Sequence, residues 1–143
     1  KVFTMAFHKT KPYNTDIQIW AMKSRYPQFK AKRKGEFEIE FVGDLHVKPE
    51  LPIYTVSITY RGSSSPLVRV LEPELVADAK HIYKESKTLC LYHPENFHWT
   101  KEKLIALNIL SWTAAWIYFY EGWLQSGVWY GPEAHHSIPK TQE

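Results

Sequence analysis

Two segments of the chain alternate between apolar and polar residues, a third resembles a short strand, and short connections join the three. The segments are residues 36–41, 54–60 and 67–71. Side chains of a strand point to opposite faces in turn, so the first segment is expected to bury Phe37, Ile39 and Phe41 and to expose its glutamates. The connections contain glycine, proline or serine. The pattern therefore predicts an antiparallel meander rather than βαβ units.

Helical signals lie on both sides of these strands. Residues 14–16 form a helix-cap pattern, and Pro27 is expected to end the following helix near Arg25. Two short helices are predicted toward the C-terminus, over residues 100–110 and 113–125, with a break at Ser111-Trp112-Thr113. The order of helix, three or four strands, long loop and helices predicts an α+β fold. In such a fold, helices pack on one antiparallel sheet of about four strands.

A chain of 143 residues is the size of one domain. We expect a domain over residues 14–136, an N-terminal extension over residues 1–13 and a tail over residues 137–143. The N-terminus shows no apolar signal core, so the expected location is the cytoplasm. Residues 104–120 carry no charge, but Asn108 and two hydroxyl residues interrupt them. We therefore expect buried helices and no membrane partner.

The chain is weakly basic. Its 18 basic and 15 acidic residues give a net charge of +3, too small for us to expect a nucleic-acid partner. Locally, Lys30, Lys32, Arg33 and Lys34 form a cluster that fits either a solvated edge strand or a docking patch. We favour the edge strand, because lysine commonly protects an unpaired strand edge.

Aromatic residues make up 15% of the chain and gather near its C-terminal end. Trp112, Trp116 and Trp123 follow helical spacing and predict a core stripe that covers the sheet. The other side of that helix carries Tyr118 and Leu124, which are expected to be exposed. An exposed aromatic surface would suit a partner groove, whereas base stacking on RNA calls for a stronger basic field.

Cys90 is the only cysteine. A single cysteine excludes an internal disulfide and a zinc site built on several thiolates. Between two leucines, Cys90 is either an inert buried thiol or a nucleophile. It stands near the end of residues 72–91, which have no clean period and predict an ordered loop. A loop of this length within a compact domain is usually either functional or a sign that an element has been misassigned.

Several histidines near Cys90 or in the tail raise the alternative of a metal site. They are His93, His98, His135 and His136. Cys-x-x-His spacing is compatible with zinc, but lone histidines more often lie on the surface or in the core, so we expect no metal and no other cofactor. His93, three residues after Cys90, would be near the thiol on nearly any backbone path and would raise its thiolate fraction.

The order and spacing of several motifs resemble the ubiquitin-conjugating enzyme core. The shared motifs are residues 51–58, Pro66-Leu67-Val68-Arg69-Val70, Pro73, His81-Ile82-Tyr83 and Leu89-Cys90-Leu91. Later motifs resemble the bacterial branch found in operons of cyclic-oligonucleotide-based antiphage signalling (CBASS). These are residues 89–94, Trp99, residues 111–116, 120–124 and 127–131, and His135. The resemblance covers roughly residues 14–136 and implies a ubiquitin-conjugating-enzyme-like fold.

The resemblance also implies a chemistry, that of a stand-alone acyl transferase. Cys90 would accept a protein C-terminus as a thioester and pass the acyl group to an amine. The implied acyl donor is the C-terminus of a cGAS-like nucleotidyltransferase. It would be either held directly or delivered by a separate ubiquitin-activating-like enzyme.

One position departs from the eukaryotic pattern of this family. An asparagine there supports the oxyanion, whereas alignment of the isoleucine-tyrosine pair places His81 in that slot. His81, or backbone N–H groups near Cys90, would then serve instead, although His81 can equally order the loop by bonding a backbone carbonyl. The predicted catalytic residues are Cys90, His81 and His93, with Asn96 as a further amide donor. Candidate acids that would take the proton of the amine are Asp78, Glu85 and Glu95.

The same residues are compatible with two other functions. A binding module on the same scaffold would hold the partner's C-terminal tail near Cys90 without turnover. A cysteine hydrolase would release a short product and leave no stable adduct, but the chain shows no further motif for one.

Overall fold

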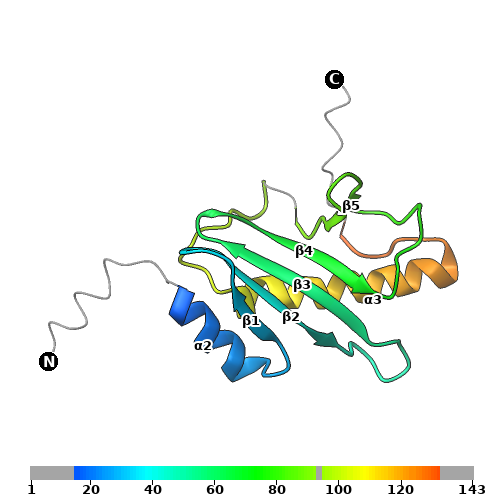
Figure 1. Ribbon diagram of the computed structural model, residues 1–143. Coiled ribbons are helices and arrows are strands. Elements are labelled where there is room, and N and C mark those ends of the chain that lie inside the picture. Colours follow the sequence, from blue (N-terminus) through cyan, green and yellow to red (C-terminus); the bar gives the residue numbers. More distant parts are fainter. Residues whose placement is uncertain (1–14, 93–94, 133–143) are drawn as a thin grey trace, which may run out of the picture.

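The computed structural model describes residues 15–92 and 95–132. Its elements, labelled as in Figure 1, are α2 (Thr15–Arg25), β1 (Lys30–Arg33), β2 (Ile39–Leu45), β3 (Tyr54–Arg61), β4 (Ser64–Glu72), β5 (Ile82–Tyr83), β6 (Thr88–Leu89), η1 (Ile105–Ile109) and α3 (Leu110–Ser126). The first four strands form one antiparallel sheet in the order β1-β2-β3-β4. The predicted α+β fold with a four-stranded meander is confirmed.

The core lies between the sheet and α3, which runs across one face of the sheet (Figure 1). Alternate residues of β2 are buried, among them Phe41, whose cross-strand partner on β3 is the buried Ile58. α3 contributes Trp116, Ile117 and Tyr120 to the same core. The two-residue period of the strands and the 3.6-residue period of the helix thus bury their apolar sides in one shared layer.

Two tyrosine hydroxyls fix α3 against its neighbours. Tyr54 of β3 is fully buried, and its hydroxyl donates a hydrogen bond to the Glu121 carboxylate of α3. Burial, followed by that hydrogen bond, raises the pKa of Tyr54 well above its ordinary value, so the phenol stays a neutral donor. The Tyr120 hydroxyl accepts a hydrogen bond of 3.0 Å from the Val76 N–H, which holds the loop after β4 onto α3.

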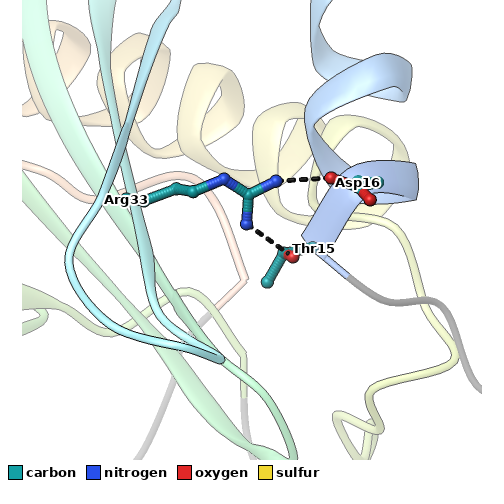
Figure 2. A network of polar contacts seen from close by, with 3 residues as sticks. All are labelled: Thr15, Asp16 and Arg33. Atoms are coloured by element: carbon teal, nitrogen blue, oxygen red, sulfur yellow. Dashed lines mark hydrogen bonds and ion pairs between the residues drawn. The ribbon is translucent and has the colours of Figure 1, made fainter.

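β1 is an exposed edge strand that an arginine ties to α2. All four of its residues are exposed. Figure 2 shows Arg33 reaching the first turn of α2, where it donates a hydrogen bond of 2.8 Å to the Thr15 hydroxyl and pairs with the Asp16 carboxylate. Lys34 lies 3.6 Å from the Glu40 carboxylate of β2. The prediction of a solvated edge strand is confirmed. Two residues of the basic cluster, Arg33 and Lys34, form ion pairs with carboxylates of α2 and β2.

The prediction that Phe37 faces the core is wrong. β2 begins at Ile39, and Phe37 lies in the bend before it with 66% of its surface exposed. The pairing of β1 with β2 starts at Arg33 and Ile39, and the Lys34 N–H bonds to the Glu38 carbonyl beyond that pair. Alternation alone cannot show where pairing begins, because that depends on the turn that joins the two strands.

The predicted helix break at residues 111–113 is also wrong. The π-helical turn η1 leads directly into α3. The hydroxyls of Ser111 and Thr113 donate to carbonyl oxygens four residues earlier, at 2.9 and 2.8 Å. Hydroxyls that are satisfied in this way continue a helix instead of capping a new one. The first of the two predicted C-terminal helices is also too long, since that segment is helical only from Ile105.

The aromatic stripe of α3 faces the core as predicted. Trp116 and Tyr120 are buried, whereas Tyr118 and Leu124 on the other side are 45% and 44% exposed. Trp112 is only partly buried and packs against the edge of this core. Within the parts of the chain that the structure describes, no helix combines the length and apolarity that a membrane span requires.

Candidate functional site

Cys90 directly follows β6, at the end of the long loop after β4. This loop contains an element that the sequence pattern did not reveal, because β5 and β6 form a short antiparallel ladder in which Ile82 pairs with Leu89. The Cys90 N–H donates a hydrogen bond of 2.9 Å to the His81 carbonyl and extends the ladder by one residue pair. The backbone that carries the thiol is therefore held by regular strand pairing.

The Cys90 thiol is buried beside the hydroxyl of Tyr83. Only 4% of Cys90 is exposed, and burial raises the pKa of its thiol from 9.0 to about 12 because the thiolate would lose its hydration. The Tyr83 hydroxyl donates a hydrogen bond to the sulfur, which acts in the opposite direction but more weakly. At neutral pH the thiol is therefore protonated, and a thiolate formed during a reaction has Tyr83 as a hydrogen-bond donor.

Two cavities meet at Cys90. The first, named here the aromatic cavity, measures about 220 Å³, and its rings are Tyr92, Phe97, Trp112, Trp116, Phe119 and Trp129. The second, named here the hydroxyl cavity, measures about 170 Å³, and its lining includes four residues that carry a hydroxyl group: Ser65, Tyr83, Thr88 and Tyr92. Cys90 lines both cavities, so a group held in either one lies close to this residue.

The rings of the aromatic cavity hold one another in place. Phe97 packs edge-on against Trp112, with centroids 4.5 Å apart, and Tyr92 lies within 4.8 and 5.1 Å of these two rings. Across the cavity, Trp129 packs near Trp116 and Phe119, at 5.9 and 6.1 Å. Ring pairs at these distances stabilise one another beyond simple burial, so the walls of the cavity are preorganised.

His81 lies in this site chiefly through its backbone. Its carbonyl accepts hydrogen bonds from the Cys90 N–H and, at 3.2 Å, from the Trp116 indole. Its φ of 60° is in the left-handed region, and its ring lies 4.6 Å from the Trp129 ring. These contacts fit a residue that orders the loop around Cys90. A direct chemical role for the His81 ring stays a prediction.

The other predicted site residues divide into three groups. His93 lies outside the described residues, as do His135 and His136. Asn96 lines the aromatic cavity together with Cys90. The three candidate acids are exposed and line neither cavity at Cys90: Asp78, Glu85 and Glu95. In residues 15–92 and 95–132, no three His, Cys, Asp or Glu side chains come together as a metal ion would require.

Sequence reasoning missed Tyr83 and the aromatic walls as parts of the site. Tyr83 entered only as a motif letter, although a phenol seven residues before a cysteine can face it across a hairpin. The indoles of Trp112 and Trp116 were predicted to lie in the core alone. Helical spacing shows that these residues share a face, but not that one end of that face lies beside Cys90.

We expect Tyr83→Phe to slow alkylation of Cys90 about threefold between pH 8 and 10, since hydrogen bonds to charged groups are among the stronger ones in proteins. The Tyr83 hydrogen bond lowers the pKa of the Cys90 thiol, so its loss raises that pKa and reduces the thiolate fraction. The remaining thiolate is more nucleophilic, which offsets part of this loss. Rates measured by intact mass, with Tyr118→Phe on the outer side of α3 as control, test this; equal rates for both variants would show that the bond has no effect.

The four-stranded meander, the helix across it and the cysteine that ends the long loop together form an α+β architecture of the ubiquitin-conjugating type. A family model described as "Type II CBASS E2 protein" matches residues 18–137. The chain therefore belongs to the family of type II CBASS E2 proteins. A comparison with curated proteins found no match.

Proposed function

We propose that this protein is an acyl carrier of the ubiquitin-conjugating type. Cys90 accepts the C-terminus of a cGAS-like nucleotidyltransferase as a thioester and passes it to an amine. The observation that carries the proposal is the position of Cys90 in the walls of two cavities, one aromatic and one with hydroxyl groups. Membership of a CBASS family supports a nucleotidyltransferase of that system as the partner.

The proposed reaction has two steps. In loading, the Cys90 sulfur attacks the activated carbonyl carbon of the partner's C-terminus; a C–S bond forms, the bond to the activating group breaks, and the thiol proton leaves with that group. In transfer, an amine attacks the same carbon; a C–N bond forms, the C–S bond breaks, and a proton from the amine returns to the sulfur. Tyr83 stabilises the charge on sulfur in both steps through its hydrogen bond.

The two predicted histidines have different parts in this proposal. His81 positions Cys90, since its carbonyl holds both the Cys90 N–H and the Trp116 indole. His93 is proposed as the group that takes a proton from the thiol or the amine. Asn96 lines the aromatic cavity, and its side-chain amide is proposed to donate a hydrogen bond to the oxyanion.

A second function, a binding module that holds the partner's tail without turnover, is favoured by one observation. The Cys90 thiol is buried and its pKa is raised to about 12, the opposite of the exposed, low-pKa cysteines of many thiol enzymes. Under the acyl-carrier proposal, attack requires removal of the thiol proton as the activated tail arrives. Under the module hypothesis, the thiol never ionises.

The two functions are distinguished by mixing the protein with its nucleotidyltransferase, with and without activating enzyme and ATP, and measuring intact mass. The acyl-carrier proposal predicts an adduct that thiols cleave, that is absent in Cys90→Ala, and that becomes a thiol-resistant ester in Cys90→Ser. An adduct retained in Cys90→Ala contradicts it. Full partner binding and full phage protection by Cys90→Ala would establish the binding module instead.

A further inference from the structure

The aromatic cavity is unsuited to an anionic ligand. None of the described residues that line it is charged, and six of them are aromatic. A carboxylate entering it would lose hydration without gaining an ionic partner, and the negative faces of the rings would repel it, which is costly. An apolar side chain would instead exchange water for contact with rings that are already held in place by one another.

The size of the cavity fits one side chain. Its volume is about 220 Å³, larger than the roughly 150 Å³ of an engineered apolar cavity that binds benzene. Ala115 of α3 lines the cavity together with Trp112 and Trp116 of the same helix. Because its side chain is a single methyl group, Ala115 leaves open the space that a larger residue would fill.

We infer that the aromatic cavity selects the acyl donor by its sequence: it takes an apolar side chain, aromatic or branched aliphatic, from the last two or three residues of the partner's C-terminal tail. The inference rests on the proposed function, since it takes that tail as the occupant. The reason is continuity, because the cavity that admits an apolar side chain also contains Cys90, where the tail's terminal carbonyl must arrive. One residue of extended chain spans about 3.3–3.6 Å, so the selected side chain lies close to the acyl carbon.

Binding of free peptides to the full-length Cys90→Ala variant tests this selectivity without any chemistry. The probes are hexapeptides that end in Xaa-Gly, with Phe, Leu, Gly or Asp as Xaa, and a second set with Xaa as the last residue; tryptophan fluorescence reports binding. In at least one set we expect Phe and Leu peptides to bind at least tenfold more tightly than Gly peptides, and Asp peptides to bind most weakly. Equal affinities in both sets would overturn the inference.

A pair of leucine substitutions locates the site. Ala115→Leu fills the cavity and should weaken binding of the Phe peptide at least tenfold. Ser111→Leu, at an exposed position one turn earlier in the same helix and outside the cavity lining, should leave it unchanged. Equal effects of the two substitutions would place the peptide elsewhere and overturn the inference.

Peptide α-thioesters of the same sequences separate this inference from the proposed function. In the wild-type protein, the Cys90 thiol exchanges with the thioester; the acyl group becomes bonded to Cys90 sulfur and the small thiol is released. Selective binding without acylation of Cys90 would leave the inference intact and contradict the acyl carrier. Acylation at one rate for all tails, with equal affinities, would support the acyl carrier and contradict the inference.

Discussion

Cys90 in the folded protein is expected to react with iodoacetamide at least about 30-fold more slowly at pH 7.5 than in the urea-unfolded chain. The shift of its pKa from 9.0 to about 12 lowers the thiolate fraction roughly 1,000-fold. Because that thiolate is more basic, it is also about 16 to 32 times more nucleophilic, which offsets part of the loss. Burial of the sulfur slows the reaction further. Alkylation followed by intact mass measures both rates. Equal rates would contradict the burial of this thiol.

Because of the same pKa shift, the free energy of unfolding depends on pH in the alkaline range. The pKa of Cys90 is higher in the folded state, so the unfolded state loses the thiol proton first; stability from this group is complete below about pH 9 and falls as pH rises toward about 12. By pH 10 the loss is roughly 1 kcal/mol. Cys90→Ser does not titrate in this range, so its unfolding free energy should fall less between pH 8 and 10. Parallel decreases for the two proteins would contradict the prediction.

Gln18→Met is expected to lower the free energy of unfolding by about 2–4 kcal/mol, because it orphans two backbone groups. Gln18 of α2 is buried; its Nε2 donates to the Lys103 carbonyl at 2.8 Å, and its Oε1 accepts from the Ile105 N–H at 3.1 Å. Through these bonds one side chain joins α2 to the start of η1. Urea unfolding monitored by tryptophan fluorescence gives the free energies.

Two further variants control that experiment. Gln28→Met removes an exposed hydrogen bond to the Asp44 carbonyl and should cost less than about 0.5 kcal/mol. Gln18→Glu keeps the acceptor but can donate to the Lys103 carbonyl only when protonated. Its carboxyl pKa is therefore raised on folding, and stability is lost as pH rises above about 4.3. If Gln18→Met were as stable as Gln28→Met, the two hydrogen bonds of Gln18 would make no net contribution to the free energy of unfolding.

Much of the architecture follows from local sequence patterns. Alternation around Ile39, Phe41 and Ile58 predicted paired strands, and helical spacing of Trp116 predicted its burial. The helix break was predicted wrongly because the groups concerned can form either of two local hydrogen bonds. A hydroxyl such as that of Ser111 can cap a new helix or bond back within a continuing one, and only the tertiary position of α3 decides between them.

The candidate site was predictable only in part. The lone Cys90 could be named from its place near the end of a long loop, and His81 from its place beside Ile82-Tyr83. Neither pattern showed that the Tyr83 hydroxyl reaches the sulfur. That contact depends on the β5–β6 ladder, which is too short to leave a periodic signal of its own.

The sequence by itself determined the strand pairing pattern, the aromatic stripe and the one residue able to form a thioester, because these depend on residue type and spacing along the chain. Tertiary structure alone decided what surrounds Cys90. Burial raised the pKa of its thiol, and packing brought Trp112, Phe119 and Trp129 to one side and Tyr83 to the other. Desolvation and cavity shape arise from residues far apart in the chain, so no local pattern carries them.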